Sequence, residues 1–210
     1  MRRAQGRALG AAVHRPPSTI NLVPHILPLM LLSITAPATA SWAQGVLTQQ
    51  EALALAVPGA RWQRHTAYLA DDDLVAIAGQ SNGVKVEQRV LSYYVASEDG
   101  RNTHVAYFDA HPVRTLPEVV MVVVTAKGTV HRVEILKFSE PPEYRAPAGW
   151  LAQFDGHDID DDLSLKGEIV GMTGATLTAR AVTGAVRRQL ALHRYLRPLA
   201  DPGSGEGTGP

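Results

Sequence analysis

A continuous apolar run at residues 119–124 constrains the fold of this chain more than any other feature. The run consists of valines and one methionine. Consecutive β-branched residues without a polar side predict a strand that is buried on both faces. Such a strand requires a sheet that is covered by other elements on each side.

The segments around this run predict the rest of the sheet. Strand-forming residues recur at 86–96 and 104–109, and Gly100 in the turn between them indicates a hairpin. Residues 130–138 alternate apolar and polar side chains, as a half-buried strand does. We therefore predict an α+β fold, with a twisted antiparallel sheet of about four strands packed by helices.

Helical patterns come before and after the predicted strands in the sequence. Thr48 and Glu51 form a capping-box pattern at the start of a short helix, and residues 70–78 form a second helix with an acidic first turn. Residues 150–154 form a short amphipathic helix. A long C-terminal helix is predicted by apolar residues at helical spacing: Ala179, Val182, Val186, Leu190 and Leu192.

The sequence Thr-Gly-Ala-Thr-Leu-Thr at residues 173–178 lies where this long helix begins. Thr173 or Thr176 is expected to be the N-cap, and Gly174 permits a sharp bend. A helix N-terminus offers unpaired N–H groups and a partial positive charge, which suit a phosphate. Ordinary helix capping is the alternative explanation from these residues alone.

The same six residues resemble the flavinylation motif of the FMN-binding domain family, which includes flavin-carrying subunits of the sodium-pumping quinone reductase and of the Rnf electron-transport complex. In that family FMN is joined through its phosphate to the last Thr of a Ser/Thr-Gly-Ala-Thr run. The resemblance implies Thr176 as the acceptor, with Thr178 as the second candidate. It also implies contacts to the phosphate from the rest of the motif: Thr173, Gly174, Ala175 and Leu177.

The resemblance extends over about residues 107–193. Glu140 opens a Pro-rich loop, and Trp150 a short helix, in the order that these elements have in the family. Trp150 and Tyr144 are candidates for stacking on the flavin ring, with core packing as the alternative. Arg114 is a candidate partner of the FMN phosphate, with a structural salt bridge as the alternative.

Two positions depart from the family pattern. Val170 stands where the family commonly has an aspartate that helps the attaching flavin transferase to recognise its target. Pro142 and Glu143 stand where relatives have Gly and Leu. The sequence therefore supports FMN binding more strongly than covalent attachment.

Composition excludes several other functions. The 210 residues contain no cysteine and have a formal net charge of zero, so disulfides, thiolate-bound iron–sulfur clusters and a nucleic-acid partner are not expected. No metal site is predicted, because the spacing of His104, His111 and His131 does not supply converging ligands. Residues 155–162 are interpreted as a solvated acidic loop. Three arginines of the last helix are interpreted as a solvated face or a docking patch: Arg180, Arg187 and Arg188.

The beginning of the chain has the pattern of a secretory leader. Arginines precede an apolar run at residues 20–34, and small-x-small cleavage patterns follow it up to Ala43. We predict a cleaved signal peptide (1–43) and a location in the periplasm or on the outer face of the cytoplasmic membrane. The rest divides into N-terminal helices and a hairpin (44–106), the FMN-binding domain (107–198) and a disordered tail (199–210).

These observations predict an exported FMN flavoprotein that carries electrons between redox partner proteins of the envelope, with a membrane complex left open as one setting. No nucleophile–base pair is evident, so a substrate-turning enzyme is not predicted. One alternative is a non-redox binding or sensory module that has lost flavinylation. Another is a flavin reductase acting on a soluble substrate.

Overall fold

The structure, a computed structural model, describes residues 47–200. The predicted signal peptide (1–43) lies outside the described residues, as do residues 201–210 of the predicted tail. Within the described part, none of the helices combines the length and the apolar character that a membrane span needs.

The sheet is an antiparallel meander in which neighbours along the chain are neighbours in space, which confirms the predicted fold class. Its order is β1-β2-β3-β4-β5. The strands are β1 (Arg61–Tyr68), β2 (Val90–Glu98), β3 (Arg101–Pro112), β4 (Pro117–Thr125) and β5 (Val130–Phe138).

Strand β1 was not predicted, because its residues do not form an apolar pattern. It pairs only with β2, with Trp62 opposite Ala96, and most of its side chains are exposed. Charged residues such as Arg61 and Arg64 are suited to an edge strand, since they discourage pairing with another chain.

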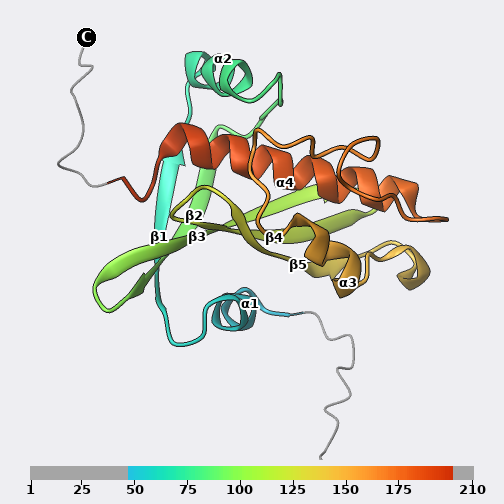
Figure 1. The fold of residues 1–210 in the computed structure, drawn as a ribbon, viewed down its shortest axis with the longest axis horizontal. Coiled ribbons are helices and arrows are strands. Elements are labelled where there is room, and N and C mark those ends of the chain that lie inside the picture. The colour runs from blue at the N-terminus through green and yellow to red at the C-terminus, as the bar shows by residue number, and fades with distance from the viewer. Residues whose placement is uncertain (1–46, 201–210) are drawn as a thin grey trace, which may run out of the picture. The chain divides into compact units, whose positions relative to one another are not determined.

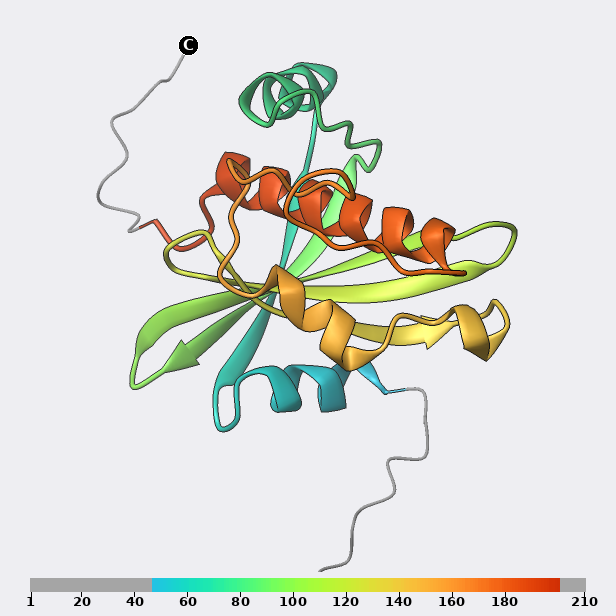
Figure 2. The ribbon, with the colours of Figure 1, turned by 45° about the vertical axis from the view of Figure 1, so that its right-hand side comes forward.

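The helices cover the two faces of the sheet unequally. They are α1 (Gln49–Ala56), α2 (Asp71–Gln80), α3 (Ala148–Leu151) and α4 (Thr176–Leu196), with short 3-10 turns η1 (Pro142–Tyr144) and η2 (Ala152–Phe154). Helix α4 crosses one face, while α1 lies on the other (Figures 1 and 2). The capping box predicted at Thr48 and Glu51 is present.

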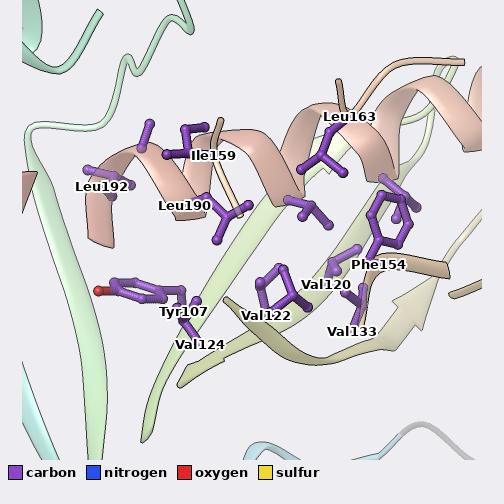
Figure 3. Close-up of a cluster of buried hydrophobic side chains, with 14 of the residues drawn as sticks. Tyr107, Val120, Val122, Val124, Val133, Phe154, Ile159, Leu163, Leu190 and Leu192 are labelled. Carbon is purple, nitrogen blue, oxygen red and sulfur yellow. The ribbon is translucent and has the colours of Figure 1, made fainter. Parts of the chain in front are cut away.

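Strand β4 is buried on both faces, as predicted. Val120, Val122 and Val124 join the large cluster beneath α4 (Figure 3). Met121 and Val123 join a smaller cluster with α1. Burial of apolar surface is the main stabilising contribution, so this strand anchors both layers of the domain.

Candidate functional site

The six-residue motif forms a tight turn followed by the start of α4. The Ala175 N–H donates to the Met172 carbonyl at 3.2 Å, and Gly174 has a φ of 81°. A residue with this φ is needed at the third position of a type II turn, which explains the glycine.

The predicted threonine N-cap is wrong. The turn brings Ala175 to the N-cap position of α4, and Thr176 is already the first helical residue. The N–H groups of the first turn of a helix have no intrahelical partner, and here no side chain caps them. These groups are therefore available to an anion.

The threonines of the motif differ in exposure. Thr176 is exposed, and its hydroxyl makes no hydrogen bond with the described part of the chain. Thr178 is only 1% exposed. Of the two candidate acceptors, Thr176 is therefore the one whose hydroxyl is accessible from solvent.

A cavity of about 480 Å³ opens beside this helix start. Three segments form it: the turn between β3 and β4, the loop around η1, and the motif itself. Of the residues predicted to contact the cofactor, all but Thr173 and Trp150 line it. The lining residues are Val113, Arg114, Glu140, Pro141, Tyr144, Gly174, Ala175, Thr176, Leu177 and Thr178.

Glu140 joins two walls of this cavity. Its Oε1 accepts hydrogen bonds from the N–H groups of Thr115 at 2.8 Å and Leu116 at 2.9 Å, and a longer one from Arg114. These bonds hold the pKa of the Glu140 carboxyl below its usual value. The carboxylate therefore fixes the turn that carries Arg114 against the loop that carries Tyr144.

Arg114 and Tyr144 face the cavity with uncommitted groups. Both side chains are exposed, and the Arg114 guanidinium forms no ion pair with any described residue. The cavity thus combines a free cation, unpaired N–H groups, a free hydroxyl and an aromatic ring. This set of groups can hold a phosphate that is joined to a planar aromatic molecule.

Trp150 lies outside the cavity and holds the segment that precedes the motif in place. The indole is buried, packs edge-on against Phe154 and donates from Nε1 to the Val170 carbonyl at 2.7 Å. The Val170 N–H donates to Gln153 at 2.8 Å. The backbone of Val170 is therefore fixed by α3 and η2, while its side chain, 71% exposed, points to solvent.

A buried polar network links β3, β4 and α4, and sequence analysis missed it. Asp109 accepts two hydrogen bonds from Arg188, at 2.9 Å each, and one from Gln189 at 2.7 Å. His111 bridges Asp109 and Glu118, at 2.9 and 3.2 Å. The interpretation of Arg188 as part of a solvated face is therefore wrong.

The network is made of mutually stabilised charges. Burial alone would raise the pKa of Asp109, but hydrogen bonds from His111 and Arg188 outweigh it and hold that pKa well below the usual range. Burial alone would lower the pKa of His111, but its bonds to Asp109 and Glu118 raise that pKa to about 9. A charged residue within an apolar strand, as at Asp109, was the sequence signal available.

The acidic loop is held by specific contacts rather than being only solvated. Asp160 pairs with Arg194 of α4. Within residues 47–200, the one group of potential metal ligands with converging atoms is His157, Asp161 and Glu168, all in or near this loop. The His157 Nδ1 lies 2.9 Å from Asp161 and 3.3 Å from Glu168, so the three side chains satisfy one another.

Comparison with known proteins gives two findings. Residues 117–191 match the family described as FMN-binding domain. One subunit of the ion-translocating oxidoreductase complex of Shewanella loihica is 30% identical over 114 residues, which are 48% of this chain and 54% of that protein. The chain thus spans about half the length of this relative. The matches confirm the resemblance and the FMN cofactor that the sequence predicted.

Proposed function

We propose that this chain, whose residues 117–191 match the FMN-binding domain family, is an exported flavoprotein that carries electrons between redox partners of the bacterial envelope. FMN is joined by a phosphoester to the Thr176 hydroxyl, and a flavin transferase makes the bond. The observation that carries this proposal is the cavity in which an exposed threonine, an uncapped helix start and a free arginine meet.

The residues present fit FMN in each of its parts. The N–H groups of the first turn of α4 and the Arg114 guanidinium suit the phosphate charge. The Tyr144 ring and the Leu177 side chain offer apolar surface to an aromatic ring system. When bound, FMN supplies the redox chemistry, while these residues hold and orient it.

The exchange of electrons with partners is proposed from the related protein, which is named as part of an ion-translocating oxidoreductase complex. Two apolar side chains near the cavity, Leu177 and Leu116, are exposed. These two side chains offer exposed apolar surface beside the cavity to a partner protein. A visible absorption spectrum of the protein purified from its native host tests the proposal against a non-redox module: flavin bands are expected, and their absence would favour the module.

Export is proposed from the leader pattern of residues 1–43. A mature protein that begins at or near Gln44 is expected in the periplasm. N-terminal sequencing of the native protein is the measurement. Residues before Ala38 in the mature protein would contradict cleavage and favour a retained anchor.

Tyr144 and Trp150 should respond differently to the same replacement. Tyr144→Ala removes an exposed ring from the cavity wall and should increase flavin fluorescence, because a stacked phenol quenches the ring, with little loss of stability. Trp150→Ala removes a buried indole and should cost about 3–5 kcal/mol of unfolding free energy. The flavin spectrum of the folded Trp150 variant should be unchanged.

Fluorescence and urea denaturation of both variants check this pair. A changed flavin spectrum in folded Trp150→Ala would place the indole against the flavin after all. Unchanged fluorescence in Tyr144→Ala would remove Tyr144 from the flavin site.

A further inference from the structure

Val170 is held by two side chains at once, and both contacts involve its backbone. The Trp150 indole Nε1 donates to the Val170 carbonyl at 2.7 Å. The Gln153 Oε1 accepts from the Val170 N–H at 2.8 Å. The Val170 side chain takes no part in these contacts and is 71% exposed. The two residues thus form a clamp on the peptide groups of position 170, three positions before the motif begins.

The two side chains of this clamp are themselves held in place. The Gln153 Nε2 donates to the Trp150 carbonyl at 3.0 Å, which leaves its Oε1 for the Val170 N–H. The Trp150 ring is buried and packs edge-on against Phe154, with 5.4 Å between the ring centroids. Side chains that are locked by packing and by further hydrogen bonds hold their partners in one geometry. The clamp therefore fixes position 170 relative to α3 and η2.

Residues 171–174 join the clamp to the start of α4 and have few hydrogen bonds of their own. Within the described part of the chain, the backbone hydrogen bond that forms here is the turn from the Ala175 N–H to the Met172 carbonyl. Met172 also packs on the core cluster, and Ile169, before the clamp, is 1% exposed. Segments with few hydrogen bonds and contacts open easily. The order of this segment therefore depends largely on its two ends, the clamp and α4.

We propose that Trp150 and Gln153 are positioning residues for the attachment of FMN. They hold residues 171–176 in the conformation that the flavin transferase binds, and this inference rests on the proposed function, in which Thr176 is the acceptor. Neither residue lines the flavin cavity, so both act through the backbone of Val170. A segment that is ordered beforehand lowers the cost of binding and of aligning the reacting hydroxyl.

The attachment step itself places a strict demand on this alignment. The Thr176 Oγ forms a bond to the flavin phosphorus of an activated flavin nucleotide, and the phosphoanhydride bond of that nucleotide breaks. The leaving nucleotide keeps the bridging oxygen, and the hydroxyl proton passes to solvent. A nucleophile has to lie close to the phosphorus and in line with the leaving group, so disorder of the segment before Thr176 slows this step.

Two replacements each remove one contact of the clamp. Trp150→Phe keeps an aromatic ring beside Phe154 and removes the N–H that donates to the Val170 carbonyl. Gln153→Met keeps an unbranched side chain and removes the oxygen that accepts from the Val170 N–H. The transferase binds the ordered fraction of the protein, so each replacement should raise the KM for this protein, by at most about tenfold, and leave kcat unchanged.

Two further variants are the controls. Gln153→Glu retains an oxygen that accepts from the Val170 N–H, so its KM should stay closer to the wild-type value than that of Gln153→Met. Gln63→Met makes the same replacement on β1, at the opposite edge of the sheet from β5, against which α3 packs. It should change neither kcat nor KM. Urea denaturation of each variant establishes that the kinetics are measured on folded protein.

The order of the segment is a second measurement, and it needs no flavin. NMR order parameters of the amides 171–174 are measured on the full mature chain expressed without the transferase. They should be near 0.85 in the wild type and fall below about 0.6 in the protein that carries both Trp150→Phe and Gln153→Met. Unchanged order parameters in that protein would overturn the proposal.

Attachment assays with the purified transferase measure kcat and KM. An unchanged KM in both single variants, or a lower kcat at constant KM, would also overturn the proposal. A wild type that the transferase never modifies would overturn the proposed function instead, while a loss of order in the double variant would still establish the clamp. The two proposals can therefore fail separately.

Discussion

Replacing Asp109 with asparagine should lower the free energy of unfolding by about 3–5 kcal/mol, the range for breaking a buried ion pair by removing one partner. The Asp109 side chain is 3% exposed and accepts from Arg188, Gln189 and His111. The amide keeps its shape but loses the charge, which leaves His111 and Arg188 without their main partner. Urea denaturation at pH 7 measures the loss.

Asp160 provides a matched control, because its partner Arg194 lies on the same helix as Arg188, the partner of Asp109. It pairs with Arg194 of α4 through two hydrogen bonds, much as Asp109 pairs with Arg188, but its side chain is 69% exposed. Asp160→Asn should therefore cost less than about 1 kcal/mol. Similar losses in the two variants would show that burial does not determine the contribution of these pairs.

The same network predicts a pH dependence of stability. The pKa of His111 is about 9 in the folded protein and about 6.5 when unfolded. Its contribution is therefore complete below about pH 6.5 and is lost as the pH rises through 9. Stability should fall by on the order of 2 to 3 kcal/mol over this range, and by less in Asp109→Asn. A wild type with constant stability up to pH 9 would contradict the assignment.

Replacing Thr176 with valine should abolish covalent FMN while leaving the domain folded. Valine keeps the shape of threonine and removes the hydroxyl that the phosphoester needs. Because Thr176 is exposed and does not cap α4, the cost in stability should be within about 0.5 kcal/mol. Flavin fluorescence of the denatured protein on a gel, after co-expression with a flavin transferase, measures the loss.

Thr178 and Thr173 are the controls within the motif. Thr178→Val should weaken FMN binding without abolishing attachment, because its buried side chain also lines the cavity. Thr173→Val should have little effect, since Thr173 lies on the turn outside the lining. Loss of fluorescence in Thr178→Val alone would move the acceptor to that residue.

The features that sequence analysis predicted correctly depend on local patterns. The apolar run at residues 119–124 requires burial on both faces whatever surrounds it, and it became β4 of the sheet. The periodicity after residue 178 likewise requires a long helix with one apolar face. The motif and the Glu140 loop came from resemblance, and the structure brings them together around one cavity.

The features that were missed depend on residues far apart in the sequence. The Asp109–Arg188 pair joins residues 79 positions apart, so neither residue alone indicates its partner. Strand β1 was missed because its residues have no apolar pattern, and only its pairing with β2 defines it as a strand. The N-cap was misplaced because the turn at Gly174, rather than the capping preference of threonine, determines where α4 begins.

The central claim is a phosphoester between FMN and Thr176, and the mass of the intact protein tests it most directly. Wild-type protein co-expressed with a flavin transferase should carry the added mass of FMN less one water, and fragmentation should place that mass on Thr176. Because Val170 replaces the usual aspartate, a fraction of unmodified protein is also expected. A wild type without the added mass would contradict covalent attachment, and the added mass on another residue would contradict the assignment to Thr176.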